Sequence, residues 1–298
     1  MALRFMYITN NVEIAHIAEQ AGTDRIWIDL ERRGKEERQR NMNTQKSMHV
    51  PEDISRLKNV LTKSEILVRI NPLYSESKKE IDDVIRRGAD IIMLPMFTNE
   101  YEVENFVDIV NGRRKVMLLL ETREAVNRLD AILAVSGIDE IHIGLNDLHL
   151  SYGMKFMFEP LANDCVDSIC TLIERRNIPY GFGGIATLDG GLLPAKIILG
   201  EHYRLKSRMV ILSRSFCDST KVNDMDTLAN TFVTEVKRLR EYEVWLSKQT
   251  LDFYDKNHKQ LQEKVKTILM KLKCCWGQNH KELCSYFYST LKNSYFVV

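Results

Sequence analysis

Short apolar runs alternate with amphipathic segments along most of the chain. Most of these runs are nearly continuous in Val, Ile, Leu and Met, as is typical of strands that are buried on both faces of a parallel sheet. The pattern predicts eight strands. They cover residues 4–9, 25–29, 66–70, 90–96, 115–121, 140–144, 179–183 and 209–213.

Between the runs, apolar residues recur at the three- and four-residue spacing of a helix with one buried face. Gly22 and Gly88 follow two of these segments, and glycine is common just after a helix. A further, strongly charged helical pattern begins near Asp224 and continues toward residue 272. The other predicted helices cover residues 12–20, 51–61, 78–87, 100–110, 123–135, 159–176 and 193–204.

Strands and helices that alternate at a spacing of about 25 residues predict an α/β fold, a (β/α)8 TIM barrel. The structural alternative is a doubly wound open sheet. Such a sheet usually has fewer strands, and no glycine-rich phosphate-binding sequence follows the first run here. We expect the barrel to cover residues 1–235. Residues 236–298 are expected to form a C-terminal helical extension that packs on the barrel or on a second subunit.

The charge of the chain is almost balanced, with 42 Lys and Arg residues against 41 Asp and Glu residues. A net charge of +1 argues against nucleic acid as a partner, because such binding needs a basic surplus that displaces counterions. No apolar run reaches the roughly 18 residues of a membrane-spanning helix. The N-terminus lacks the order of basic and apolar residues found in a secretory signal. We therefore expect a cytoplasmic protein without a membrane anchor.

Charged residues stand at the C-terminal ends of several predicted strands, on the rim where barrel enzymes build their sites. They are Asp29 and Glu31 after the second run, Arg69 in the third, Glu121 at the end of the fifth and Asp147 after the sixth. Mg²⁺ and Mn²⁺ prefer carboxylate oxygens together with water and substrate oxygens. Glu121 and Asp147, on adjacent strands, are therefore candidate ligands of a divalent metal. Arg69 would face the same substrate.

These residues also have structural explanations. A carboxylate just after a strand often caps the next helix, and Glu121 precedes one. Arg69 could instead pair with Asp29 or Glu31. Their place at the strand C-termini favours a functional role.

Three segments resemble the HpcH/HpaI aldolase and citrate lyase β-subunit family: LVRINPLYSESKKEIDDVIRRGADIIMLPM, LLLETREAVNRL and GIDEIHIGLNDLHLSYGM. The similarity extends over roughly residues 3 to 230. Its most specific parts are Glu-Thr-Arg-Glu at 121–124 and Gly-x-x-Asp-Leu at 144–148. Each motif is weak alone, but the two together, behind Val-Arg-Ile-Asn at the family's spacing, are fairly specific.

The resemblance implies a metal-dependent (β/α)8 barrel that makes or breaks a carbon–carbon bond next to a pyruvate-like or acyl-CoA enolate. Glu121 and Asp147 match the metal ligands of the family, and Arg69 matches the arginine that contacts the keto-acid or enolate oxygen. Asp29 and Glu31 match the acidic residues after the second strand. A metal would stabilise the enolate charge as a Lewis acid. A Schiff-base mechanism is not indicated, because no run carries a lysine that faces the mouth.

The segment after the second strand departs from the pyruvate aldolases of the family, which carry Gly-Glu-His there with the histidine as the base. Here the chain reads Asp29-Leu30-Glu31-Arg32, and an arginine stays protonated. His49, Glu31 and a metal-bound water are alternative bases, although a surface-loop position is the simpler explanation for His49.

The loop after the second strand also holds six basic residues, which indicate either a solvated lid or a funnel for an anionic substrate. They are Arg32, Arg33, Lys35, Arg38, Arg40 and Lys46.

Other residues near the strand ends receive simpler interpretations. His142 lies inside the sixth run and is expected to be a core histidine with satisfied hydrogen bonds. His149, two residues after Asp147, is a candidate to face the site. Gly183 and Gly184 either let a substrate approach backbone amides or turn the chain.

We therefore predict a metal-dependent carbon–carbon lyase of the class II aldolase type that acts on a 2-oxo acid such as pyruvate through an enolate. The alternatives are a citrate-lyase-like enzyme with a CoA thioester substrate and a barrel that binds a metabolite without turnover. By analogy with the family, we also expect a homo-oligomer in which the C-terminal helices meet a neighbour.

Overall fold

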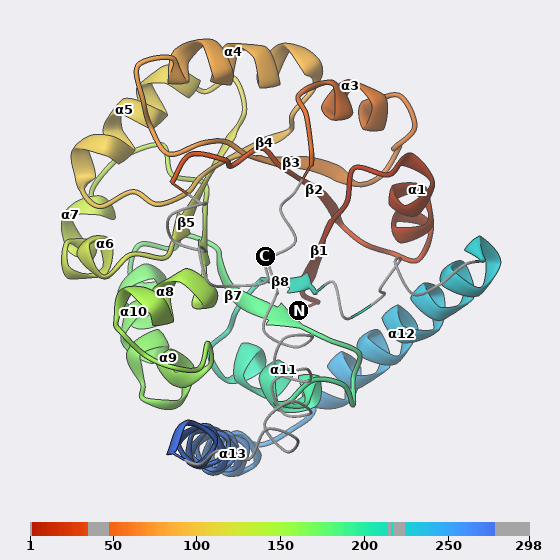
Figure 1. Cartoon of the computed structure of the whole chain (residues 1–298), viewed down its shortest axis with the longest axis vertical. Helices are drawn as coiled ribbons and strands as arrows, with labels where there is room; N and C mark the ends of the chain where they lie inside the picture. Colours follow the sequence, from red (N-terminus) through yellow and green to blue (C-terminus); the bar gives the residue numbers. More distant parts are fainter. Residues whose placement is uncertain (1, 35–47, 214–215, 217–223, 278–298) are drawn as a thin grey trace.

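The eight strands close into a parallel barrel in a computed structural model, which describes residues 2–34, 48–213, 216 and 224–277 (Figure 1). The strands follow one another around the barrel in sequence order, and β8 pairs with β1. The prediction of a (β/α)8 barrel is confirmed. The strands are β1 Arg4–Ile8, β2 Arg25–Asp29, β3 Glu65–Arg69, β4 Ile91–Leu94, β5 Lys115–Leu120, β6 Glu140–Ile143, β7 Tyr180–Ile185 and β8 Met209–Leu212.

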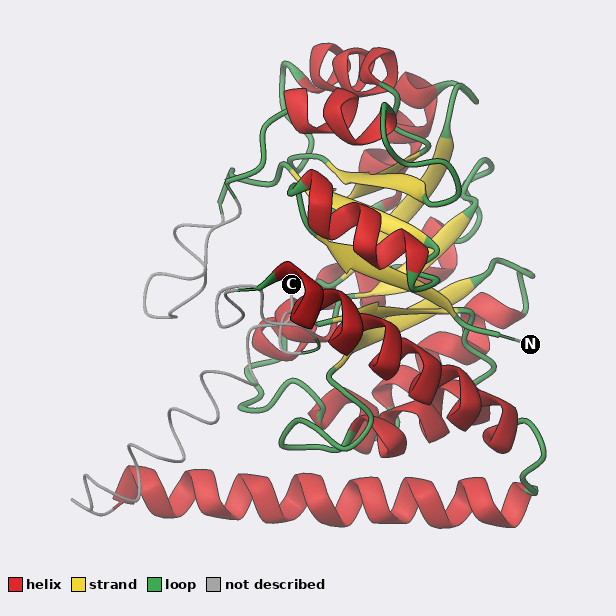
Figure 2. Ribbon diagram, turned by 90° about the vertical axis from the view of Figure 1, so that its right-hand side faces the viewer, coloured by secondary structure: helices red, strands yellow, loops and turns green. Residues whose placement is uncertain are grey.

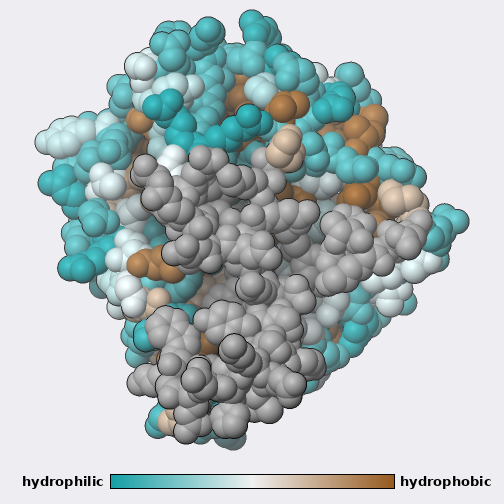
Figure 3. Space-filling model, in the orientation of Figure 1, coloured by the Kyte–Doolittle hydropathy of each residue, from teal (hydrophilic) through white to brown (hydrophobic). Residues whose placement is uncertain are grey.

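The helices surround the barrel as an outer ring (Figure 1). On the face seen in Figure 3, the described surface over α4 and α5 is mainly hydrophilic, as expected where a helix buries only one stripe. The ring contains α1 Val12–Gln20, α3 Glu52–Lys58, α4 Ser77–Arg87, α5 Glu100–Val110, α6 Arg123–Asn127, α7 Leu129–Ile132, α8 Leu145–Ser151, α9 Glu159–Ala162, α10 Cys165–Glu174, α11 Ala195–Arg204 and α12 Met225–Leu246.

Three segments differ from the predicted helices and loops. The helix expected over 123–135 is divided at Arg128 into α6 and α7. The helix expected over 159–176 is divided into α9 and α10 by Asp164, whose φ of 64° lies in the left-handed region. The structure also contains α8 between β6 and α9, where no helix was predicted, because its seven residues are too few to give a clear periodic signal.

Buried charges meet inside the barrel at the N-terminal end of the strands. The Arg25 guanidinium on β2 donates to both carboxylate oxygens of Glu140 on β6, at 2.5 and 2.8 Å, and to Glu65 on β3 at 3.0 Å. Arg25 is fully buried, and only 4% of Glu140 is exposed. The pair therefore joins opposite sides of the barrel through charges that have little access to water.

The two helices after β8 extend the ring. α12 packs against α1 and buries Leu228, Phe232 and Val236, so it takes the place of the eighth barrel helix. The boundary expected at residue 235 lies within α12. α13 Leu251–Gly277 runs along the outside of the barrel beside α11 (Figures 1 and 2). None of the helices in the described part of the chain combines the length and apolar character needed to cross a lipid bilayer.

A buried carboxylate on α11 holds α13. Glu201 is fully buried and accepts hydrogen bonds from Asn257 Nδ2 and His258 Nδ1 of α13, both at 2.8 Å. His258 Nε2 lies 3.1 Å from Asp164 Oδ1. The hydrogen bond to Glu201 raises the pKa of His258 above its ordinary value of 6.5.

We expect Glu140→Leu to lower the free energy of unfolding by about 3 kcal/mol, because it leaves the buried Arg25 with fewer partners. Urea denaturation measures the change. Lys256→Ala is the control, since it removes only an exposed ion pair with Asp252, and such pairs contribute about 0.5 kcal/mol or less. Equal losses in the two variants would contradict a structural role for the buried pair.

The raised pKa of His258 predicts how the docking of α13 depends on pH. A pKa that is higher in the folded state gives stability that is complete below the ordinary value and is lost as pH rises through the folded value. The stability advantage of the wild type over His258→Gln should therefore be complete below about pH 6.5 and should shrink over the pH range above it. Urea denaturation across this range measures it. An advantage that does not change with pH would rule out the protonated contact.

Candidate active site

An ion pair joins the C-terminal ends of β2 and β3. Asp29 and Arg69 are paired by the strand register, and the guanidinium donates to both oxygens of the carboxylate, at 2.9 and 2.8 Å. Arg69 Nη1 also lies 3.4 Å from Glu31 Oε2. All three side chains are almost completely buried. The structure therefore brings together the three residues predicted as catalytic, in the pairing that the sequence offered as a structural alternative.

Arg69 remains a cation in this environment. Burial opposes its charge, but the neighbouring carboxylates of Asp29 and Glu31 outweigh burial and raise the pKa of Arg69 above its ordinary value. Glu121 contributes in the same direction. The guanidinium carbon also lies 5.3 Å from the centre of the Trp27 ring, within the range of a cation–π contact. The mouth of the barrel thus holds a fixed positive charge whose field extends to Glu121.

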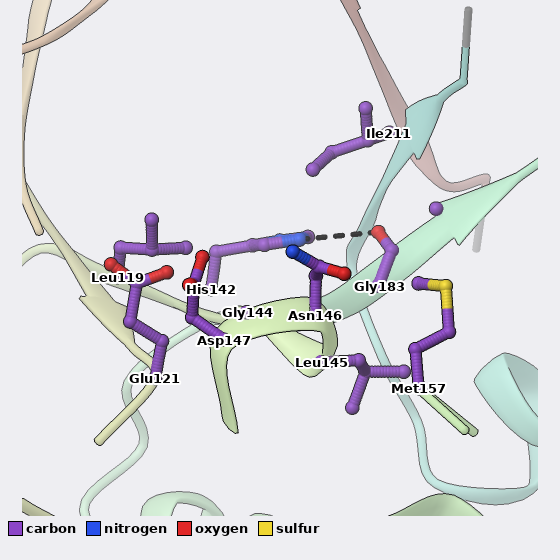
Figure 4. Close-up of a pocket in the computed structure, with 11 residues that line it drawn as sticks. Leu119, Glu121, His142, Gly144, Leu145, Asn146, Asp147, Met157, Gly183 and Ile211 are labelled. Atoms are coloured by element: carbon purple, nitrogen blue, oxygen red, sulfur yellow. Dashed lines mark hydrogen bonds between the residues drawn. The ribbon is translucent and has the colours of Figure 1, made fainter. Parts of the chain in front are cut away.

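Glu121 and Asp147 line one small cavity (Figure 4). Glu121 directly follows β5, and Asp147 lies in the first turn of α8. Figure 4 shows the two carboxylates at the same end of the cavity, beside Leu119. The complete lining consists of Leu119, Glu121, His142, Gly144, Leu145, Asn146, Asp147, Met157, Gly183, Gly184 and Ile211. The Asp29–Arg69 pair is not part of this lining.

Glu121 is not the cap of the helix that follows it. The cap of α6 is Thr122, whose hydroxyl oxygen accepts a hydrogen bond from Ala125 N at 3.2 Å. Glu121 Oε1 instead accepts from Met96 N, at 3.1 Å, in the loop after β4. The capping alternative is therefore excluded, and the carboxylate is directed to the cavity.

Gly144 allows β6 to approach Glu121 closely. A Cβ atom at this position would lie 2.8 Å from Glu121 Oε2 and 3.0 Å from Glu121 Cβ. Any other residue would displace the carboxylate. This glycine, the first residue of the Gly-x-x-Asp-Leu motif, therefore helps to bring Glu121 and Asp147 to the same cavity.

The donor set of the cavity suits a hard divalent cation. Mg²⁺ is commonly bound by one or two carboxylates and completes its shell with water and substrate oxygens. Glu121, Asp147 and the amide oxygen of Asn146 supply this kind of ligand. Within the described residues, no cluster of three or more His, Cys, Asp or Glu side chains is arranged to hold a metal. A cation held by these three side chains would keep positions for water and substrate oxygens.

His49 is buried, so the prediction that it lies on the surface of the loop is wrong. Only 8% of the residue is exposed, and its Nδ1 accepts a hydrogen bond from Asp29 N at 3.0 Å. Arg32 Nη2 donates to the His49 carbonyl at 3.0 Å. Because Nδ1 acts as an acceptor, the proton of the neutral ring is on Nε2, and the ring presents a donor there rather than a base.

The start of the basic loop is held by Asn71, two residues after β3. Asn71 Oδ1 accepts hydrogen bonds from the backbone N–H groups of Arg32 and Arg33, at 2.9 and 3.0 Å. The Arg33 guanidinium lies over the Tyr74 ring. The other basic residues of the predicted anion funnel lie outside the described residues: Lys35, Arg38, Arg40 and Lys46.

The two histidines near β6, His142 and His149, both differ from their predictions. His142 was expected to be a satisfied core residue, yet it lines the cavity and its Nδ1 has no hydrogen-bond partner among the described residues. His149 was a candidate to face the site, but it is not part of the cavity lining, and its Nδ1 bonds to the Leu145 carbonyl at 3.2 Å. The sequence could have indicated the place of His142. Residues two apart on a strand lie on the same face, so His142 lies on the same face as Gly144.

A family model and several curated relatives match part of this chain. The family model described as HpcH/HpaI aldolase/citrate lyase matches residues 5–171. A hydroxypyruvate/pyruvate aldolase of Roseobacter denitrificans is 28% identical over 34% of this chain and 39% of the relative. A pyruvate aldolase of Rhizobium etli is 35% identical over the same shares, 34% and 39%. The chain therefore matches well under half the length of these relatives.

Solved structures share the fold. An HpcH/HpaI aldolase from Desulfitobacterium hafniense superposes with a TM-score of 0.55 at 19% identity, over 80% of this chain and 93% of the other. A citrate lyase β subunit from M. tuberculosis, complexed with oxaloacetate and magnesium, gives 0.54 at 15% identity, over 78% and 97%. At these identities the likeness establishes the barrel architecture alone.

We expect Gly144→Ala to weaken the binding of Mn²⁺ by about tenfold or more, because a shift of Glu121 disturbs a proposed ligand. Calorimetric titration with Mn²⁺ measures the affinity. Glu124→Ala is the control, since this exposed side chain belongs to the same motif as Glu121 but is not a proposed ligand. Unchanged Mn²⁺ affinity in Gly144→Ala would show that the close approach of β6 is not needed for the site.

Proposed function

The chain belongs to the HpcH/HpaI aldolase/citrate lyase family, and on that premise we propose that it is a carbon–carbon lyase of the aldolase type. Its substrate would be a 2-oxo acid such as pyruvate, which reacts through an enolate. The names of the relatives, pyruvate aldolase and hydroxypyruvate/pyruvate aldolase, support a 2-oxo acid over a CoA thioester.

The observation that carries the proposal is the placement of Glu121 and Asp147 at one cavity on the C-terminal rim. We propose that these two carboxylates hold Mg²⁺ or Mn²⁺. The metal, when bound, would supply Lewis-acid stabilisation of the negative charge that develops on the 2-oxo acid. The remaining work falls to residues of this chain that orient the substrate and move a proton.

Arg69 is proposed to stabilise the same charge from the opposite side of the mouth. Its guanidinium is fixed by two hydrogen bonds to Asp29, so it needs no reorganisation when charge develops on the substrate. Asp29 is then a positioning residue. Loss of one preorganised donor of this kind typically lowers turnover by about 10²–10³.

The residue that accepts the proton must differ from the histidine of the family pattern. Arg32, at the position of the family histidine, bonds through its guanidinium to the His49 carbonyl and stays charged. His49 already accepts a hydrogen bond from Asp29 N at Nδ1, so that nitrogen is not available as the base. We therefore assign the acceptor role to Glu31, a buried carboxylate 3.4 Å from Arg69 Nη1.

Proton exchange at C3 of pyruvate tests the proposal directly. With Mg²⁺ or Mn²⁺ in D₂O, the wild type should exchange the methyl protons of pyruvate, followed by NMR, and removal of metal with EDTA should abolish the exchange. Glu121→Gln and Asp147→Asn should lower the rate at least about 100-fold, because each removes a proposed ligand. Glu124→Gln is the matched control, since this glutamate belongs to the same motif but is exposed.

Other outcomes would identify the alternatives. Binding of acetyl-CoA without exchange of pyruvate protons would indicate a thioester substrate. A protein that binds neither Mn²⁺ nor either substrate would be a barrel without this chemistry. Exchange that is equally fast in wild type, Glu121→Gln and Asp147→Asn would remove the carboxylate pair from the mechanism.

A further inference from the structure

His142 is a fully buried histidine in the lining of the cavity. Side chains of a strand alternate between its two faces, and Glu140 reaches Arg25 across the barrel interior. His142 and Gly144 therefore also face the interior, on the path from the bottom of the barrel to its mouth. Figure 4 shows the ring between the two carboxylates and Gly183.

The hydrogen bond to Gly183 fixes the tautomer of His142. Nε2 lies 3.2 Å from the Gly183 carbonyl oxygen. Because a carbonyl oxygen only accepts, Nε2 must carry the proton, and Nδ1 is left with a lone pair. Burial lowers the pKa of His142 to about 3, so the ring is neutral at physiological pH. His142 is thus a permanent, uncharged hydrogen-bond acceptor.

Nothing in the described part of the chain donates to this acceptor. Nδ1 of His142 is buried and has no hydrogen-bond partner there. Leu119, Met157 and Ile211 supply apolar contacts to the lining, and Gly144 supplies no side chain. A buried acceptor without a donor is unfavourable, so an apolar residue would fit this wall better unless a bound molecule brings a donor with it.

We propose that His142 Nδ1 accepts a hydrogen bond from a hydroxyl group on C3 of the substrate. The inference rests on the proposed function and makes His142 a specificity-determining residue. The donor substrate is then a 2-oxo acid that carries a hydroxyl at C3, because the methyl group of pyruvate cannot donate. The amide oxygen of Asn146, another polar side chain of the lining, is assigned above to the metal.

A comparison of hydroxypyruvate with pyruvate tests this role. NMR in D₂O with Mn²⁺ measures C3 proton exchange for both acids, and calorimetry measures their binding. The wild type should prefer hydroxypyruvate about tenfold or more, since a site built for a hydroxyl discriminates against the analogue that lacks it. His142→Phe should remove the preference through a loss with hydroxypyruvate alone. His142→Asn, which places an amide oxygen near the position of Nδ1, should restore part of it.

The two proposals fail in different ways. Equal rates and equal affinities for the two acids in the wild type would overturn the role of His142 and leave the lyase proposal standing. The same conclusion follows if His142→Phe, folded as judged by circular dichroism, slows both acids by one factor. If neither acid exchanges protons, the lyase proposal fails. Calorimetry then still decides on His142: a preference for hydroxypyruvate that is lost in His142→Phe supports it, and no preference overturns it.

Discussion

The closed parallel barrel allows each strand residue only two directions, and one of them is an interior that water scarcely reaches. An unpaired charge that points inward is therefore costly, and a partner on another strand offsets that cost. At the N-terminal end, Arg25 meets Glu140 from the opposite side of the barrel. At the C-terminal end, Asp29 binds Arg69 from the neighbouring strand. The rest of the molecule depends on this constraint.

The charged side chains at the two ends of the barrel are arranged in different ways. Those at the N-terminal end serve the fold, whereas those at the C-terminal end belong to the candidate site. The N-terminal charges form a closed group of side chains that stabilises the barrel. At the other end, Gly144 admits the Glu121 carboxylate to a cavity that also receives Asp147. Two carboxylates at one cavity repel each other, and the divalent cation that we propose would offset that repulsion. The cavity thus combines the two proposed metal ligands with an uncharged hydrogen-bond acceptor, His142.

Local patterns predicted the elements well where they were long and regular. The bounds of α1 and α5 agree with the predicted helices, because one apolar stripe and a clear cap define each of them. The predictions failed where a short segment or a single backbone angle decides the outcome. α8 has only seven residues, and the left-handed Asp164 divides a segment whose periodicity is continuous. Such details depend on packing against neighbouring elements, which periodicity does not record.

The sequence by itself determined the barrel and the rim, because strand and helix periods are local and parallel strands bring all their C-terminal ends to one side. It also placed Glu121, Asp147 and Arg69 on that rim. Only the tertiary structure decided what each side chain contacts. His49 is buried because it meets Asp29, and His142 has one satisfied nitrogen because Gly183 lies opposite, 41 residues later in the chain. Contacts over such sequence distances are set by closure of the barrel, which no local pattern contains.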